Sequence, residues 1–220
     1  MAKEIKKENA QNVAEAVSKT DLFFQENKKT IIIAVAAVIV VALGIFLYQK
    51  FVAMPKKAEA YAQLYPAETL FQDQNFEQAL NGDGNVLGFA QVIDEYGAKA
   101  GKAVYLYAGV CELQLGNYEN ALSYLKKYNG KEQILAARAL ACMGDAYVGL
   151  EQYDKALGYF VKAAKKSDDI FAADYLLKAG VVAEELGKTE EALGYYKQIK
   201  EQYPDSSVEY EKYISRIEAK

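Results

Sequence analysis

Residues 144–156 read GDAYVGLEQYDKA, and two other stretches of the chain repeat this pattern. Residues 109–121 read GVCELQLGNYENA, and residues 180–192 read GVVAEELGKTEEA. The first glycines of the three stretches are 35 and 36 residues apart, and an alanine follows each glycine after twelve positions. Self-similarity at this period is typical of stacked structural repeats. The sequence therefore predicts a repeat architecture.

Small residues in each stretch predict where two helices cross. Two antiparallel helices approach closely only where their side chains are small, so the glycine and the alanine mark the crossing. Four positions after each alanine stands a bulky residue that would fill the gap beside the crossing: Leu125, Phe160 and Tyr196. Short turns between the paired helices are predicted at 116–117, 151–152 and 187–188.

The pattern resembles the tetratricopeptide repeat, which pairs two antiparallel helices in each unit. The resemblance implies an all-α fold in which helix hairpins stack into an α-solenoid. It assigns the units to 102–135, 137–170 and 173–204, with a degenerate unit at about 60–100 and a C-terminal capping helix at 205–219. At 81–85 the degenerate unit reads NGDGN, an insertion that must break or displace its second helix before helix resumes over 86–96.

Residues 31–48 read IIIAVAAVIVVALGIFLY and contain no charged residue, amide or proline. An α-helix of this length covers about 27 Å, which is close to the hydrocarbon thickness of a bilayer. A soluble helix rarely lacks a polar face altogether, and lysines and aromatic residues stand at both ends of the run. The sequence predicts a single transmembrane helix over 31–49, between a leader over 1–30 and a domain over 50–220.

The apolar run is expected to be an uncleaved anchor. It is longer than the apolar region of a signal peptide, and residues 49–55 lack a small-x-small cleavage site. Lysines close to the two ends of the run balance three against three, whereas three further lysines of the leader favour a cytoplasmic N-terminus. Within the leader, Thr20 is predicted to cap a short amphipathic helix that leads into the anchor.

Charge and composition exclude several functions. The chain carries a net charge of −4, and the part from Phe51 onward carries 19 basic and 25 acidic residues, or −6. An acidic domain is a poor electrostatic partner for nucleic acid or for anionic lipid surfaces. Histidine, the commonest general base and metal ligand, is absent. No group of residues has a spacing that catalysis requires, so we expect neither an enzyme nor a bound metal or cofactor.

Cysteine and tyrosine are expected to serve packing. Cys111 and Cys142 fall in the first helices of neighbouring units at positions facing the interior, which predicts buried free thiols, with a disulfide as the alternative. Many tyrosines recur at helical spacing and are interpreted as core or repeat-interface residues rather than a ligand-binding row. They are Tyr105, Tyr107, Tyr118, Tyr124, Tyr128, Tyr147, Tyr153, Tyr159, Tyr175, Tyr195 and Tyr196.

In tetratricopeptide repeats the first helix of each pair lines the concave face, so the resemblance implies a protein-binding groove there. By repeat position its residues are Leu106, Val110, Leu113, Gln114, Arg138, Asp145, Val148, Leu177, Lys178, Val181 and Glu184. Such a groove, apolar at first and mixed in charge later, fits an extended or helical peptide or a partner protein. Alternatively, the face packs against a neighbouring chain of a homo-oligomer.

Repeat proteins that hold the carboxylate tail of cytosolic chaperones place Lys and Asn where this sequence has Leu106 and Val110. They also place basic residues in the third unit, where Asp174 occupies one of the two positions. The sequence therefore argues against that class of partner.

The segment before the apolar run, FFQENKK over 23–29, resembles the YfgM-type ancillary subunits of the bacterial Sec translocon. This resemblance implies an inner-membrane protein with a cytoplasmic N-terminus and periplasmic repeats. Its implied partners are translocon subunits, a membrane-anchored periplasmic chaperone and emerging secretory clients. A scaffold for another envelope complex, and a regulator that acts through the leader, remain as alternatives. No catalytic residue carries over from the resemblance.

Overall fold

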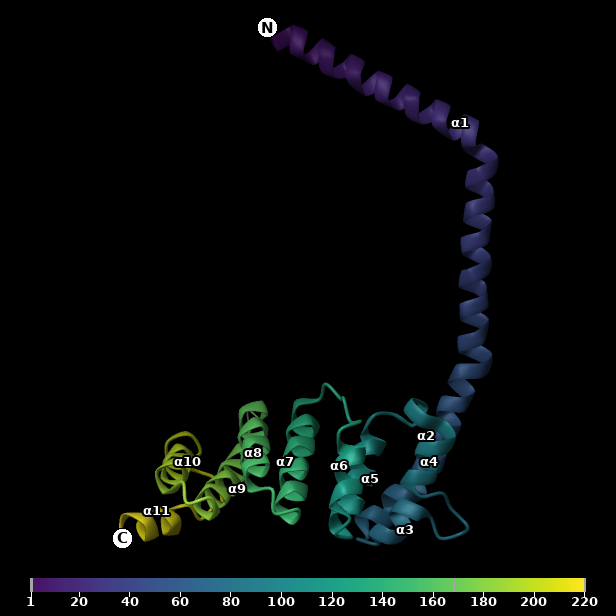
Figure 1. The fold of residues 1–220 in the computed structure, drawn as a ribbon. Coiled ribbons are helices and arrows are strands. Elements are labelled where there is room, and N and C mark those ends of the chain that lie inside the picture. Colours follow the sequence, from purple (N-terminus) through teal and green to yellow (C-terminus); the bar gives the residue numbers. More distant parts are fainter. Residues whose placement is uncertain (1, 168, 220) are drawn as a thin grey trace. The chain divides into compact units, whose positions relative to one another are not determined.

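The computed structural model describes residues 2–167 and 169–219, and these residues form helices and connecting loops without a β-strand (Figure 1). The chain divides into two compact units, Met1–Pro55 and Lys56–Lys220. The all-α fold expected from the sequence is therefore confirmed. The two units are described separately.

The first unit is dominated by α1, which runs from Ala2 to Tyr48 and is followed by a π-helical segment over Gln49–Ala53. The helix continues through Thr20, so the prediction of a helix start at that residue is wrong. The leader contains neither glycine nor proline, and nothing in it interrupts the helix. The separate amphipathic helix of the leader is thus replaced by one long helix.

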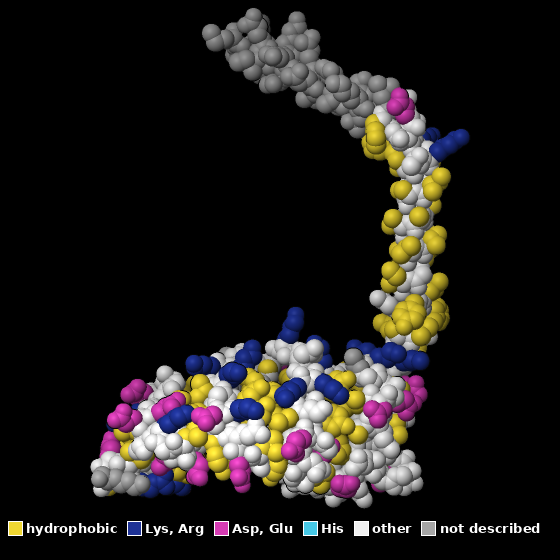
Figure 2. Space-filling model, viewed as in Figure 1, with side chains coloured by type: hydrophobic (Ala, Val, Ile, Leu, Met, Phe, Trp, Pro, Cys, Tyr) yellow, Lys and Arg dark blue, Asp and Glu magenta, His cyan; other side chains and the backbone are white. Residues whose placement is uncertain are grey.

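The apolar part of α1 is exposed. The large hydrophobic side chains between Ile32 and Tyr48 are 50–69% exposed, and Figure 2 shows hydrophobic side chains along both borders of the helix in this view. This helix is long and apolar enough to span a membrane, and its most apolar 18-residue window has no buried part. By length and composition, α1 is therefore a candidate membrane span.

The second unit, which we call the repeat domain, consists of helix pairs followed by a last short helix. The first pair is α2 with the short α3, and α4 follows it. The helices are α2 Met54–Gln72, α3 Phe76–Asn81, α4 Phe89–Tyr96, α5 Ala103–Gln114, α6 Tyr118–Leu125, α7 Gln133–Gly149, α8 Tyr153–Lys166, α9 Phe171–Glu185, α10 Thr189–Gln202 and α11 Glu211–Glu218. A 3₁₀ turn covers Gly97–Ala100. Helix α7 begins at Gln133, four residues before the unit boundary placed at 137 from the sequence.

The predicted break in the degenerate unit is confirmed. Helix α3 ends at Asn81, and Asp83 then closes a tight loop by accepting hydrogen bonds from the backbone N–H groups of Asn85 and Val86, at 2.9 and 3.0 Å. Helix α4 begins at Phe89 rather than at Val86, because the loop continues as far as Gly88. The backbone N–H of Gly88 donates to the Gln91 side chain and starts the helix there.

The crossing glycines behave as the repeat pattern predicts. A Cβ atom on Gly109 would lie 2.6 Å from the Leu125 side chain, and one on Gly144 would lie 2.6 Å from the Phe160 ring. At Gly180 the corresponding distance to the Tyr196 ring is 2.3 Å. The three alanines of the pattern, which lie on the second helices, are fully buried: Ala121, Ala156 and Ala192. Each second helix therefore packs directly against the glycine of its first helix.

One residue in each intra-repeat turn adopts a left-handed conformation. These residues are Gln74, Gly116, Glu151 and Gly187, with φ values of 62°, 80°, 58° and 71°. In every turn the next residue donates its N–H to a carbonyl of the first helix at 2.8–2.9 Å, as in Asn117 to Glu112. This hydrogen bond closes the helix in a Schellman-type cap, for which glycine is the favoured residue.

We expect Glu151→Gly to raise the free energy of unfolding by about 0.5–1 kcal/mol, because a side chain in the left-handed region is strained. Glu151 is exposed, so the substitution removes little packing. Gly116→Ala, at the equivalent turn, should lower stability by about 1 kcal/mol. Thermal unfolding of the detergent-solubilised chain, followed by circular dichroism, measures both. A lower melting temperature for Glu151→Gly would contradict this account of the turn.

The core of the repeat domain consists of two clusters of buried residues, one spanning α2–α5 and the other spanning α5–α11. Each tyrosine predicted to serve packing is buried in a cluster or packs against one. Tyr147 and Tyr159 stack with ring centroids 5.2 Å apart, and Tyr107 stacks on Phe89 at 5.4 Å. The prediction for the tyrosines is thus confirmed, although Tyr107 and Tyr175 also line a cavity.

Cys111 and Cys142 are buried free thiols, as predicted. Burial raises the pKa of the Cys111 thiol to about 12 and that of Cys142 to about 11. Because the ordinary value is 9.0, the unfolded thiols ionise first. Their contribution to stability is therefore fully present below about pH 9 and decreases as the pH rises toward 11.

We expect neither thiol to react with Ellman's reagent at pH 8 in the folded chain, because both are protonated and covered. Both should react after denaturation. The masses of the chain with and without reductant should agree, whereas a 2 Da difference would indicate a disulfide.

Candidate protein-binding groove

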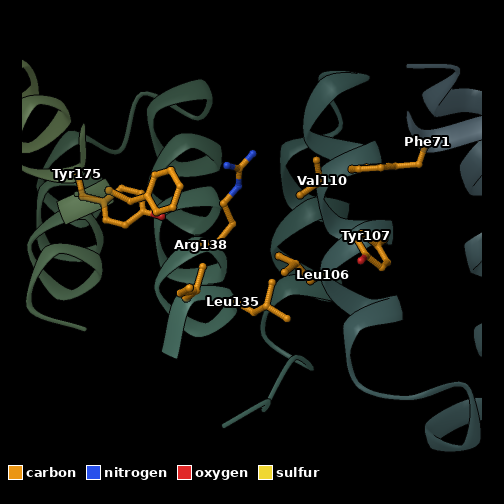
Figure 3. Close-up of a pocket in the computed structure, with 9 residues that line it drawn as sticks. Phe71, Leu106, Tyr107, Val110, Leu135, Arg138 and Tyr175 are labelled. Atoms are coloured by element: carbon orange, nitrogen blue, oxygen red, sulfur yellow. The ribbon is translucent and has the colours of Figure 1, made fainter. Parts of the chain in front are cut away.

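The first helices of successive repeats line a cavity of about 270 Å³ in the repeat domain. Helices α5, α7 and α9 supply most of its wall, and the end of α2 contributes Phe71 (Figure 3). The lining residues are Phe71, Leu106, Tyr107, Val110, Ile134, Leu135, Arg138, Phe171 and Tyr175. The wall is thus almost entirely apolar and rich in aromatic rings.

A second cavity, of about 370 Å³, adjoins the first. The two share Val110, Arg138, Phe171 and Tyr175, so together they form one continuous depression, which we call the groove. The second cavity is more polar than the first, because Gln114, Asp145, Asp174 and Lys178 line it beside apolar residues. The groove therefore changes from apolar to mixed in charge along its length.

Arg138 on α7 is the one charged residue among those described as lining the first cavity. Figure 3 shows its side chain extending into the space between Val110 and Tyr175. A guanidinium beside aromatic rings offers a planar donor for carboxylates and carbonyls. The apolar end of the groove can thus hold a bulky apolar side chain while Arg138 binds a polar or acidic neighbour.

An ion pair crosses the second cavity. Lys178 Nζ on α9 lies 2.6 and 2.8 Å from the carboxylate oxygens of Asp145 on α7. Both side chains are about a third or more exposed, so the pair adds at most about 1 kcal/mol to stability. Its main effect is to neutralise two charges of the groove and to connect successive first helices.

The structure brings eight of the eleven predicted groove residues to the cavity walls. These are Leu106, Val110, Leu113, Gln114, Arg138, Asp145, Leu177 and Lys178. The other three, Val148, Val181 and Glu184, lie outside both walls, because they stand nearer the C-terminal ends of α7 and α9 than the groove reaches. Glu184 accepts hydrogen bonds from Tyr196 at 2.7 Å and from Arg216 at 2.6 Å, which ties α9 to α10 and α11.

The sequence interpretation missed much of the aromatic wall. On α7, Ile134 stands one turn before Arg138. On α9, Phe171 stands one turn before Asp174. Helical spacing along the two helices could therefore have revealed both residues. Tyr107 and Tyr175 were interpreted as packing residues only. Phe71 comes from the degenerate first unit, where no repeat register assigned a groove position.

Stacked hairpins whose first helices line a groove define an α-solenoid. Residues 103–131 and residues 143–207 match tetratricopeptide repeat families, so the chain carries these repeats.

Two solved structures of MamA are similar to the chain at 18% sequence identity. One, "MamA 41-end from Desulfovibrio magneticus RS-1", has a TM-score of 0.54, and the match covers 68% of this chain and 78% of that chain. The other, "MamA RS-1 ArsTM double mutant", has a TM-score of 0.55, and the match covers 66% of this chain and 76% of that chain. At this identity the likeness shows the fold alone. No protein in the curated comparison matches the sequence.

Proposed function

We propose that this chain is a membrane-tethered tetratricopeptide-repeat scaffold that binds other proteins in the groove. The observation that carries the proposal is the continuous groove over three first helices, apolar at one end and polar at the other. Ile134 and Phe171 at the apolar end are 55% and 45% exposed, although both are large hydrophobic residues. Exposed apolar residues around a polar-rimmed depression are typical of protein-binding surfaces.

The finer part of the proposal concerns place and partner. The apolar part of α1 crosses the inner membrane, with the leader in the cytoplasm and the repeat domain in the periplasm. The FFQENKK segment supports a role as an ancillary Sec translocon subunit that contacts a membrane-anchored periplasmic chaperone and emerging secretory clients. We also propose that the role is not enzymatic, because the groove offers shape and charge rather than a catalytic constellation.

Tethering to the membrane explains how a groove of modest affinity can capture a partner. A binding surface that is fixed to the membrane meets its partner at a high local concentration, so weak contacts suffice for capture. On this account the groove releases its partner readily, as a scaffold beside a protein-export channel requires.

Membrane topology is the first test. The chain should stay in the membrane fraction after alkaline carbonate extraction, and protease should degrade the repeat domain only after the outer membrane is opened. A chain that is extracted by carbonate would contradict the anchor, and a repeat domain protected from protease in opened cells would contradict its periplasmic placement.

Photo-crosslinking in intact cells tests the groove. Leu106 and Val110 are 3% and 9% exposed, so a photoreactive amino acid belongs at Ile134, on the groove wall. The matched control is Asn120, which is exposed on α6. We expect partner crosslinks from the first position and few from the second, with a several-fold decrease when Arg138→Glu is added.

The identity of the trapped neighbour separates the alternatives. Crosslinks to translocon or chaperone subunits support the proposal. Crosslinks to subunits of another envelope complex would instead identify the chain as a scaffold of that complex. A second copy of the chain would identify the groove as an oligomer interface. If the isolated leader captures a cytoplasmic protein while Ile134 captures none, the regulatory role is the better one.

A further inference from the structure

Exposed lysines gather along one edge of the repeat domain, where the loops between successive repeats lie. In Figure 2, dark blue side chains predominate along one border of the domain, and magenta side chains predominate along the opposite border and at the two ends. We call the edge with the inter-repeat loops the basic edge. Its lysines are Lys56, Lys57, Lys99, Lys102, Lys126, Lys127, Lys131, Lys165 and Lys166, and all nine are exposed.

Contacts between the loops show that the basic edge is one continuous surface. Lys102 Nζ, before α5, donates a hydrogen bond to the Asn129 carbonyl, before α7, at 3.1 Å. Gly101, the residue before Lys102, lies close to α2, because a Cβ atom at Gly101 would lie 3.0 Å from the Tyr61 hydroxyl. Lys57 Nζ in turn lies 5.7 Å from the centroid of the Tyr61 ring. The start of α2 and two inter-repeat loops are thus neighbours.

The charges of the domain are segregated between its two edges. From α2 to the start of α9, five carboxylates accompany the nine lysines at the described part of the basic edge: Glu59, Asp94, Glu95, Glu132 and Asp169. At the end of α10, Glu201 and Asp205 follow Lys200. Among the residues that the structure describes, the opposite edge, at the intra-repeat turns, has two lysines, Lys155 and Lys188, against eight exposed carboxylates. These are Asp73, Glu77, Glu119, Glu151, Asp154, Glu185, Glu190 and Glu191.

This segregation revises the expectation drawn from net charge. The part of the chain from Phe51 onward carries −6, which predicts poor attraction to anionic lipid. Attraction at short range depends on the charges that face the surface, because salt screens the more distant ones within about 8–10 Å. The basic edge, with its excess of lysines, can therefore attract an anionic surface although the whole domain is acidic.

We propose that the basic edge docks on the anionic phospholipid headgroups of the membrane that holds the chain. The proposal rests on the membrane anchor proposed above. Lys56 follows Tyr48, the last residue of the apolar run, by eight residues, so the chain between them spans at most about 29 Å. The first lysines of the edge are therefore kept near the headgroups, and tethering favours contacts by the others.

A lipid surface fits better than a nucleic acid. The lysines lie on loops and helix ends along an edge rather than in a channel, and an edge can lie on a flat bilayer. Among the described residues of the edge, the large exposed aromatic rings are Tyr61 and Phe171, at 48% and 45% exposure, and two rings are few for base stacking. The membrane is also always present for an anchored chain.

Energy transfer from the domain to lipid headgroups tests the proposal with the full chain in vesicles. A fluorescent donor is attached to a cysteine introduced by Asn129→Cys at the basic edge, or by Glu119→Cys at the opposite edge. The native thiols are buried, so labelling is selective. Vesicles of phosphatidylcholine alone are compared with vesicles that contain about 25 mol% phosphatidylglycerol, both with an acceptor-labelled headgroup.

We expect phosphatidylglycerol to raise the ratio of docked to free domain roughly tenfold when the donor is at residue 129, and about 0.5 M NaCl to reverse the increase. The donor at residue 119 should not move closer to the lipid. Replacing Lys99, Lys126, Lys127 and Lys131 by Gln should abolish the increase. Replacing Lys155, Lys162, Lys188 and Lys197 by Gln removes the same charge elsewhere and should preserve it.

Transfer that is independent of phosphatidylglycerol, or equal losses in the two lysine variants, would overturn the proposal. A signal that a single-stranded oligonucleotide displaces at equal charge concentration would assign the edge to nucleic acid instead. Flotation of the chain with phosphatidylcholine vesicles is measured first, because failure there contradicts the anchor and not the edge. Equal circular dichroism of all variants shows that the substitutions leave the fold intact.

Discussion

Tyr196→Ala is expected to lower the free energy of unfolding of the repeat domain by about 3–5 kcal/mol, as truncation of a large core aromatic residue does. Tyr196 is fully buried on α10 and fills the space beside Gly180 of α9. Its ring centroid lies 5.0 Å from that of Tyr213 on α11. The substitution therefore leaves a cavity where the last hairpin meets the capping helix.

The hydroxyl group of Tyr196 contributes separately. It donates to Glu184 at 2.7 Å, and burial together with this bond raises the pKa of Tyr196 far above its ordinary value. Tyr196→Phe should cost only about 1 kcal/mol, because Glu184 keeps its pairing with Arg216.

Chemical denaturation of the detergent-solubilised chain, followed by circular dichroism, measures both variants. Tyr65→Ala is the control, since Tyr65 is 71% exposed and its loss should change stability by less than about 0.5 kcal/mol. If Tyr196→Phe costs as much as Tyr196→Ala, the hydrogen bond rather than the packing holds the last repeat.

The fold was predictable because its decisive positions recur in the sequence. Gly109, Gly144 and Gly180 stand in register, and the structure uses all three for close helix contact. The left-handed turn residues were harder to identify. Glycine marks two of them, but Gln74 and Glu151 occupy the same conformation and give no signal by residue type. There the surrounding helix pair overrides local preference.

The groove was only partly predictable. Repeat position predicts which face of a helix lines the groove, but it does not predict how far along the helix the groove extends. Arg138, Asp145 and Lys178, which register places on this face, line the second cavity. Glu184 follows the same register, yet it pairs with Arg216 of the capping helix, whose docking no repeat pattern encodes. Phe71 likewise lies in the degenerate unit, where no repeat register assigns a groove position.

The charge segregation was invisible to composition for a related reason. Net charge adds all residues, whereas the hairpin topology sorts them between two edges according to whether they stand in inter-repeat loops or intra-repeat turns. A sequence with the same composition but with its lysines in the turns would have the opposite polarity. Topology, rather than residue count, therefore decides which partner each edge can meet.

Gly144→Ala and Gly158→Ala should change stability in opposite directions, although both replace a helical glycine by the best helix former. In helix α8, Gly158 has no atom within 4 Å of a would-be Cβ, so the substitution should add up to about 1 kcal/mol. In helix α7, a Cβ on Gly144 would lie 2.6 Å from the Phe160 ring, which is 1% exposed and cannot move aside. The overpacking cost of about 1–3 kcal/mol then exceeds the gain in propensity.

The same denaturation experiment compares the two variants, and Gly144→Ala combined with Phe160→Leu serves as the rescue. The smaller side chain makes room for the new methyl group, so the double variant should be more stable than the sum of the two single changes predicts. Additive losses would show that Gly144 and Phe160 do not share one packing site. Since Gly109 with Leu125 and Gly180 with Tyr196 are the same arrangement, the result applies to each hairpin that lines the groove.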